Sequence, residues 1–139
     1  MMERRQSIRV DCELSSEFRS FDVKSPLNKV SEATVINISR GGVRIRTDEF
    51  VPVQANLYIY LHLPQHETIE IRIIPTWVNE VPNLNKYEVG ARFVEITSEQ
   101  EDAIQDFQYR TLLQRLPSRR DMVKDLQADE PPGSLDLAA

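Results

Sequence analysis

"IRVDCEL", residues 8–14, alternates apolar and polar side chains without interruption. In an extended chain its apolar residues would point to one side and its charged residues to the other. This period of two is typical of a β-strand that has one face in a protein core. The stretch therefore predicts a first strand from Ile8 that turns Ile8, Val10, Cys12 and Leu14 inward.

Five further stretches have the composition and alternation of strands. They are "EATVINI" (32–38), "VRIRT" (43–47), "VQANLYIYLHL" (53–63), "TIEIRIIPTWVNEV" (68–81) and "YEVGARFVEI" (87–96). In the third strand Val43 and Ile45 are expected inward, with Arg44 and Arg46 outward. The fourth is expected to bury Val53, Ala55, Leu57, Ile59, Leu61 and Leu63. Pro75 predicts a bulge or an edge position, because proline cannot donate to the strand ladder.

After the sixth strand the pattern becomes helical. "SEQE", residues 98–101, has the form of a capping box in which Ser98 and Glu101 bond each other's backbone amides. The helix is expected to run to about Leu116, with Ile104 and Phe107 packed on the sheet. A second apolar stripe, at i, i+3, i+4 and i+7, is either additional core or a contact with another subunit, such as a homodimer. Its residues are Tyr109, Leu112, Leu113 and Leu116.

Six short antiparallel strands followed by a helix predict a mainly β protein, a six-stranded antiparallel β-barrel with a C-terminal α-helix, since closure removes exposed strand edges. A length of 139 residues suits one domain. We expect a flexible N-terminal segment at 1–7, the barrel and helix at 8–116, and a disordered acidic tail at 117–139.

Composition excludes several classes of protein. A formal net charge of -5 argues against DNA or RNA binding, which needs an extended basic face. The chain has no apolar run long enough for membrane insertion and no secretory signal, so a cytoplasmic location is expected. Cys12 is the one cysteine, which leaves no internal disulfide and suits a reducing compartment. Its place on the apolar side of a strand favours a structural role over a reactive thiol.

Basic residues gather at two places in this acidic chain. "ERRQSIRV" (3–10) contains Arg4, Arg5 and Arg9. Residues 37–46, which begin with "NISRGG" (37–42) at the end of the second strand, contain Arg40, Arg44 and Arg46 and no acidic residue. If the strand from Ile8 pairs antiparallel with the strand that ends at Ile38, these two stretches meet at one mouth of the barrel. Guanidinium groups beside small polar side chains and a glycine turn predict a site for a nucleotide phosphate and a guanine base.

"RRQSIR" followed by "NISRGG" resembles the RxxxR and [D/N]xSxxG motifs of the PilZ domain family. "YEVGARFVEI" is similar to the last barrel strand of that family, and the resemblance covers about residues 3–112. It implies binding of the bacterial second messenger cyclic di-GMP. Arg5 and Arg9 would hold phosphate and guanine, Asn37 and Ser39 a guanine edge, and Gly42 would keep the turn open. Arg4 precedes the motif, and an arginine there is associated in the family with a stacked pair of messenger molecules; Arg40 and Gly41 are additional candidate contacts.

The resemblance implies a bacterial receptor or adaptor that is not an enzyme and carries no cofactor besides this ligand. Ligand binding would order the N-terminal arginine segment and so signal to a separate effector protein. The alternative is a PilZ-like interaction module, for example in pilus or flagellar assembly, that does not bind the nucleotide.

Two other functions, catalysis and RNA binding, have less support in the sequence. His62, His66 and Glu67 would supply too few ligands for a convincing metal site, and the chain shows no catalytic nucleophile with its base. Tyr58 and Tyr60 share a strand face, yet no basic cluster accompanies them as RNA binding would require. The sequence does not establish whether Trp77, the single tryptophan, lies near enough to the predicted ligand to report binding by fluorescence.

Overall fold

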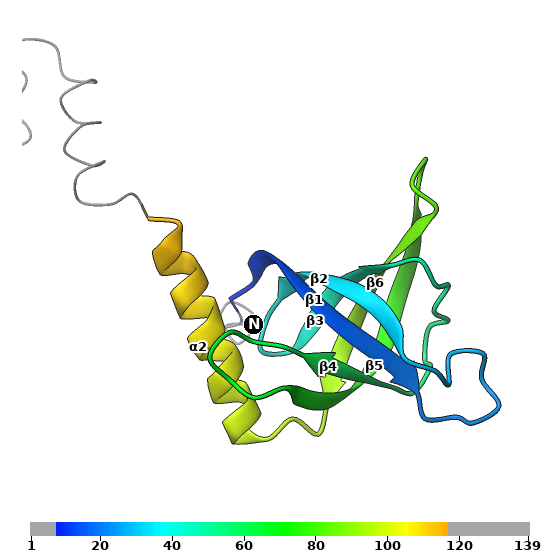
Figure 1. Ribbon diagram of the computed structural model, residues 1–139, viewed down its shortest axis with the longest axis horizontal. Coiled ribbons are helices and arrows are strands. Elements are labelled where there is room, and N and C mark those ends of the chain that lie inside the picture. The colour runs from blue at the N-terminus through cyan, green and yellow to red at the C-terminus, as the bar shows by residue number, and fades with distance from the viewer. Residues whose placement is uncertain (1–7, 117–139) are drawn as a thin grey trace, which may run out of the picture.

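In the computed structural model, which describes residues 8–116, six antiparallel strands close into a barrel and a helix lies beside it (Figure 1). The order around the barrel is β1-β2-β3-β6-β5-β4, and β4 pairs back with β1. The predicted fold class is confirmed. The elements are β1 (Val10–Ser20), β2 (Ser31–Ile38), β3 (Gly42–Thr47), β4 (Leu57–Leu61), β5 (Ile69–Val81), β6 (Lys86–Val94) and α2 (Ser98–Gln114). The segments predicted to be flexible, 1–7 and 117–139, lie outside the described residues.

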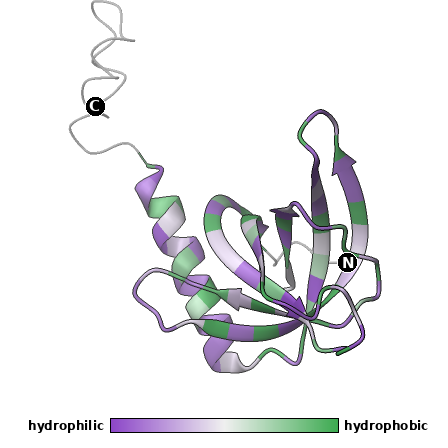
Figure 2. Ribbon diagram, turned by 45° about the vertical axis from the view of Figure 1, so that its right-hand side comes forward, coloured by the Kyte–Doolittle hydropathy of each residue, from purple (hydrophilic) through white to green (hydrophobic). Residues whose placement is uncertain are grey.

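The alternation in the sequence becomes the inside and outside of the barrel. Hydrophobic and hydrophilic residues alternate along the strand ribbons (Figure 2). Val43 and Ile45 of β3 are buried, as predicted, whereas Arg44 and Arg46 point outward. The interior is filled mainly by branched aliphatic side chains, which suit a pleated surface.

The first strand is displaced by two residues from its predicted start. Pairing with β2 begins at Val10 opposite Ile38, and Ile8 lies before the strand with 55% of its surface exposed. The expectation that Ile8 turns into the core was therefore wrong. At the other end β1 continues to Ser20, because Ser16 to Ser20 pair with β4 and close the barrel.

The fourth strand is shorter than predicted. β4 covers only Leu57–Leu61, and Val53 is 50% exposed instead of buried. The backbone turns before the strand: Ala55 N donates to Pro52 O, and Gln54 has a positive φ of 69°. This turn breaks the period of two that the sequence appeared to continue from Val53. Leu63, also predicted inward, is buried just after the strand.

The fifth strand contains the bulge that Pro75 predicted. The register against β6 shifts between Pro75, opposite Ala91, and Trp77, opposite Gly90. A bulge re-aims the side chains that follow it. Beyond it β5 and β6 continue as a two-stranded hairpin that projects from the barrel (Figure 1).

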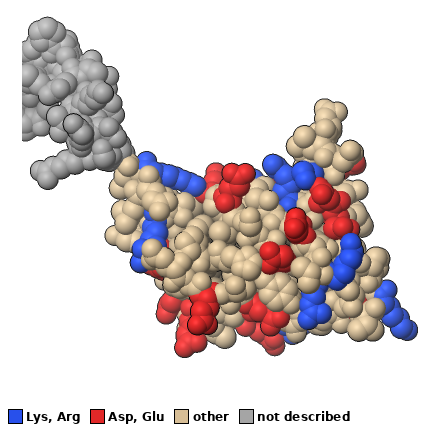
Figure 3. All heavy atoms as spheres, in the orientation of Figure 1, with Lys and Arg blue, Asp and Glu red and all other residues tan. Residues whose placement is uncertain are grey.

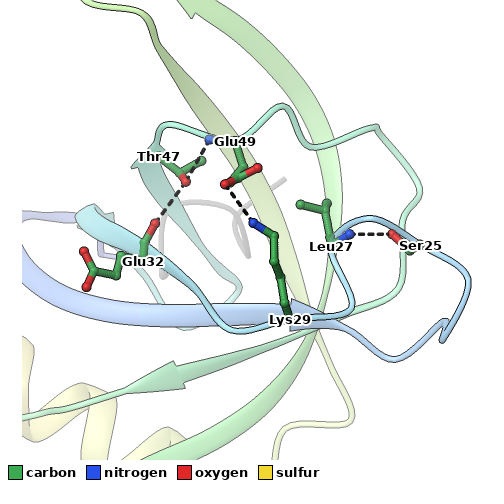
Figure 4. A network of polar contacts seen from close by, with 6 residues as sticks. All are labelled: Ser25, Leu27, Lys29, Glu32, Thr47 and Glu49. Atoms are coloured by element: carbon green, nitrogen blue, oxygen red, sulfur yellow. Dashed lines mark hydrogen bonds and ion pairs between the residues drawn. The ribbon is translucent and has the colours of Figure 1, made fainter.

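The long loop between β1 and β2 closes the β1–β2 hairpin at the end that lies away from Ile38. Thr47 at the end of β3 donates its hydroxyl to Glu32 O and accepts from Glu49 N, and Lys29 forms an ion pair with Glu49 at 3.3 Å (Figure 4). Within the loop, Leu27 N donates to the Ser25 hydroxyl. These contacts fix the loop without using the residues predicted to bind a ligand.

The helix begins one residue earlier than its predicted cap. Thr97, not Ser98, is the N-cap: its hydroxyl accepts from Gln100 N at 3.1 Å, and the Gln100 side chain accepts from Thr97 N at 3.0 Å. Threonine and glutamine serve a capping box as well as serine and glutamate do, so the two registers were indistinguishable by residue type.

The helix buries one apolar stripe and exposes the other. Ile104 and Phe107 are buried, as predicted. The alternative that the second stripe is additional core was wrong, because Tyr109, Leu112, Leu113 and Leu116 are between 41% and 64% exposed. No helix within residues 8–116 is both long and apolar enough to cross a membrane.

Candidate functional site

The N-terminal strand and the "NISRGG" stretch lie side by side. Val10 pairs with Ile38 and Asp11 pairs with Asn37, so the beginning of β1 lies against the end of β2. The antiparallel pairing predicted from the sequence is confirmed. Arg9 therefore lies next to the turn that starts at Ser39.

A surface cavity of about 300 Å³ opens at this junction. It is bordered by the residue before β1, by the turn between β2 and β3, and by the parts of β5 and β6 around the bulge. Its lining residues are Arg9, Ser39, Gly41, Gly42, Val43, Arg44, Thr76, Trp77, Gly90, Ala91 and Arg92. Its volume is at the lower end of the range found for small-molecule sites.

One transverse row of outward-facing positions runs across five strands at the cavity. Asp11 is paired with Asn37, Asn37 with Arg44, Arg44 with Gly90, and Gly90 with Trp77. Directly opposed residues of neighbouring strands share a face of the sheet. The barrel thus places an acid, an amide, a guanidinium and an indole along one line.

The turn of residues 39–42 is held by its own serine. Ser39 N donates to Gly42 O at 2.9 Å, and the Ser39 hydroxyl lies 3.3 Å from Gly41 N and 3.4 Å from Gly42 O. The two hydroxyl contacts are long for hydrogen bonds, so this group retains capacity for a stronger partner.

The two glycines of the turn have different roles, and neither adopts a positive φ. A Cβ added at Gly42 would overlap Ala91 O and would lie 3.1 Å from Arg92 Cα. A Cβ at Gly41 would meet nothing within 4 Å. Gly42 is therefore required by the close approach of β3 to β6, whereas Gly41 is not sterically required.

The indole of Trp77 packs directly on the backbone of Gly90. A Cβ at Gly90 would overlap the indole ring, so only glycine leaves room for it. Thr76, the neighbour of Trp77, donates its hydroxyl to Gly90 O at 3.2 Å. Trp77 remains 37% exposed and lines the same cavity as Arg9 and Ser39. The sequence left the distance of Trp77 from the site open; the bulge at Pro75 turns Trp77 to the outer face beside Gly90.

The cavity is locally basic in an acidic protein. Arg9, Arg44 and Arg92 line it, and of these three only Arg44 has an acidic partner within residues 8–116, Glu88, at 3.9 Å. Elsewhere charges of both signs are mixed, as the face drawn in Figure 3 shows. Guanidinium groups that line a surface cavity are suited to binding an anion.

The remaining predicted site residues have different positions. Asn37 is 9% exposed and donates to the Asp11 carboxylate at 2.8 Å; it lies beside the cavity lining, in the row with Arg44. Arg40 lines a separate groove next to α2. Arg4 and Arg5 lie outside the described residues.

Sequence reasoning did not assign Arg44, Thr76, Trp77, Gly90 or Arg92 to the site. Two signals in the sequence could have indicated them. A glycine inside a strand, Gly90, marks a close approach of another group, and Pro75 marks the bulge that re-aims Trp77.

The other candidate groups have structural partners. His62 contacts Glu17 at 2.6 Å and Thr68 at 2.9 Å, and His66 contacts Asp106 at 2.8 Å. Within residues 8–116 no group of three or more His, Cys, Asp or Glu side chains is placed to hold a metal ion. Burial raises the pKa of the Cys12 thiol to about 11, which keeps it protonated and unreactive at neutral pH.

Comparisons with known proteins agree with this architecture. Residues 3–110 match the PilZ domain family. Comparison with curated proteins gave no match. Among solved structures, the Bacillus subtilis inhibitor of motility (MotI/DgrA) is similar with a TM-score of 0.65 and 19% identity, over 82% of this chain and 54% of that one.

The similar structures include complexes with cyclic di-GMP. The PilZ domain of YcgR from Escherichia coli has a TM-score of 0.63 and 13% identity, over 80% of this chain and 93% of that one. The MrkH complex from K. pneumonia has a TM-score of 0.62 and 15% identity, over 80% of this chain and 53% of that one. The chain therefore spans about half the length of MotI/DgrA and of MrkH. At these identities the similarity establishes the fold alone.

Proposed function

The chain belongs to the PilZ domain family, and on this premise we propose that it is a receptor for cyclic di-GMP that acts by binding, without catalysis. PilZ domains are generally binding modules, and solved relatives hold this ligand. The observation that carries the proposal is the cavity that Arg9, Ser39 and Trp77 share.

The chemistry of the cavity suits a guanine nucleotide with phosphates. A guanidinium binds phosphate oxygens bidentately and also matches O6 and N7 of guanine. An indole offers a face on which a base stacks. Arg9 and Arg92 would supply the first kind of contact and Trp77 the second.

Asn37 and Ser39 would bind a guanine edge through the hydrogen-bond donors and acceptors that their present contacts leave available. A carboxamide has two donor hydrogens and an oxygen acceptor, and the bond from Asn37 to Asp11 uses one donor. The Ser39 hydroxyl would exchange its long contacts within the turn for a shorter one to the base. Gly42 keeps β3 close to β6 so that the turn borders the cavity.

A cavity of about 300 Å³ would enclose part of a cyclic dinucleotide and leave the rest accessible. Arg4 and Arg5 precede Arg9 closely enough in the chain to cover that part. Binding would order the N-terminal arginine segment over the mouth of the barrel, at a cost in chain entropy that the arginine contacts must exceed. Arg4 would further support a stacked pair of ligands. Arg40 and Gly41, also candidate contacts, would lie at the edge of the bound ligand.

The ordered segment and the ligand together would offer a new surface to an effector protein in a bacterial cytoplasm. The exposed side chains of Tyr109, Leu112, Leu113 and Leu116 form an apolar strip on α2, which we propose for contact with that effector or with a second copy of this chain. Sedimentation analysis distinguishes them: a homodimer gives twice the 16.1 kDa mass of the chain, whereas a monomer at every concentration assigns the strip to the effector.

Calorimetric titration with cyclic di-GMP, with GMP as the control ligand, tests the proposed function. We expect saturable heat with cyclic di-GMP and much weaker binding of GMP, which has one base and no second phosphate linkage. A stoichiometry of two ligands per chain would indicate the stacked pair. Absence of binding would support the alternative, an interaction module that does not bind the nucleotide.

A further inference from the structure

Gln108 is a buried polar residue on a helix that otherwise buries apolar side chains. It is 5% exposed, and its Nε2 donates to Ile8 O at 2.7 Å and to Ile38 O at 3.1 Å. A carboxamide nitrogen carries two hydrogens, so both donors are used. One side chain therefore connects α2 to Ile8, just before β1, and to Ile38 at the end of β2.

Both acceptors lie within the stretches that border the candidate site. Ile8 immediately precedes Arg9, and Ile38 lies between Asn37 and Ser39. Pairing of β1 with β2 begins at Val10 opposite Ile38, so Ile8 lies beyond the paired residues. Gln108 thus holds the backbone of Ile8 at a point where the strand ladder does not.

Ile8 and Arg9 border two different hollows. Ile8 lines a groove of about 230 Å³ together with Arg40, Gln108, Tyr109 and Leu112, whereas Arg9 lines the candidate ligand cavity. The backbone of residues 8 and 9 therefore separates the cavity from the face of α2. The Ile8 carbonyl that Gln108 holds belongs to the peptide bond that leads into Arg9, so this hydrogen bond fixes the backbone next to a residue of the cavity lining.

We propose that Gln108 is a positioning residue: it holds the Arg9 segment ready for the ligand and transmits ligand binding to α2. This inference rests on the proposed function and adds the route by which the site reaches the helix. Holding a contact residue in place before binding reduces the entropy lost on binding. Because coupling between two sites is reciprocal, bound ligand also strengthens the bonds that Gln108 makes.

The first experiment needs no ligand. Gln108→Leu removes both donors at similar volume, and Gln105→Leu is the matched control, because Gln105 lies on the same helix and groove but is exposed. Amide hydrogen exchange is followed by NMR. We expect residues 9–11 to exchange at least about fivefold faster in Gln108→Leu than in Gln105→Leu, with core amides such as those of Ile45 and Ile59 unchanged. Equal rates in the two variants would overturn the positioning role.

The second experiment measures cyclic di-GMP affinity by calorimetry. Gln108→Leu should bind about 5- to 30-fold more weakly than the unmodified protein, a typical size for coupling between sites. Gln105→Leu should differ by less than about twofold. In the unmodified protein, the side-chain NH₂ signals of Gln108, which is outside the cavity lining, should shift and exchange more slowly when ligand is added.

The outcomes separate this inference from the proposed function. If the unmodified protein does not bind cyclic di-GMP, the proposed function fails, and the ligand-free exchange rates still decide whether Gln108 holds the Arg9 segment. If the unmodified protein binds normally but both variants have equal affinity, or the Gln108 NH₂ signals stay unchanged, the transmission to α2 is rejected.

Discussion

Arg9 is the described residue that joins the N-terminal motif to the cavity. It lines the cavity and has no acidic partner among residues 8–116. Arg9→Ala should remove a charge-assisted contact of about 1.5–3 kcal/mol, or about 10- to 150-fold in cyclic di-GMP affinity by calorimetry. Arg19→Ala is the control, because Arg19 lies at the far end of β1 from Arg9 and donates to Tyr60. Equal affinities of the two variants would remove Arg9 from the site.

Gly42 and Gly41 are adjacent residues with opposite steric surroundings. Gly42→Ala forces a methyl group against the backbone of Ala91, so we expect a loss of about 1–3 kcal/mol in the free energy of unfolding. Gly41→Ala meets no atom and should change it by less than about 0.5 kcal/mol. Urea denaturation of both variants provides the comparison, and equal stabilities would show that β3 can move away from β6.

Among the elements, α2 has an N-cap that the sequence allowed at either Thr97 or Ser98. Thr97→Ala removes the hydroxyl that accepts from Gln100 N and should destabilise the protein by about 0.5–2 kcal/mol. Ser98→Ala removes a hydroxyl that takes no part in the capping box and should cost less than about 0.5 kcal/mol. Thermal denaturation measures both, and the reverse order would place the cap at Ser98.

A contact between α2 and the loop from β4 to β5 depends on pH. Asp106 accepts from His66 at 2.8 Å and from Arg110 Nε through both carboxylate oxygens. The His66 hydrogen bond, and then that of Arg110, lowers the pKa of Asp106 below its ordinary value of 3.8. Because the folded-state pKa is lowered, this stabilisation is present above pH 3.8 and is lost as the pH falls through the folded-state pKa.

NMR titration of the Asp106 side-chain carboxyl carbon tests this assignment. We expect the midpoint to rise toward 3.8 in His66→Ala and to stay low in His62→Ala, since His62 contacts Glu17 and Thr68 instead. A midpoint that is unchanged in His66→Ala would show that Arg110 alone lowers this pKa.

At the scale of the whole molecule, the strand pattern in the sequence predicted the barrel and the meeting of "IRV" with "NISRGG". Alternation reports which side of a strand is buried, and it succeeded for β3 and for most of β1. It failed at Val53 and Ile8, where a turn or the end of pairing changes the backbone while the sequence continues to alternate.

The cavity lining was predictable only in part, because closure of the barrel decides it. Arg9, Ser39 and Gly42 belong to recognisable motifs, whereas Trp77 and Arg92 reach the cavity through the β3–β6–β5 register and the bulge at Pro75. Gln108 has no signal in the helical pattern, since a glutamine between apolar residues usually faces water. Its role follows from two carbonyl groups that lie 70 and 100 residues away in the chain.

We propose that one cavity, made by Arg9, the turn after β2 and the β5–β6 bulge, binds cyclic di-GMP. NMR titration of ¹⁵N-labelled protein tests it most directly, because Trp77 supplies the only indole signal of the chain. We expect the Trp77 indole NH and the amides of Ser39, Gly41 and Gly42 to shift together and to saturate with the ligand. Unchanged spectra, or shifts confined to the polar cavity around Ser15, Glu32 and Lys86, would contradict it.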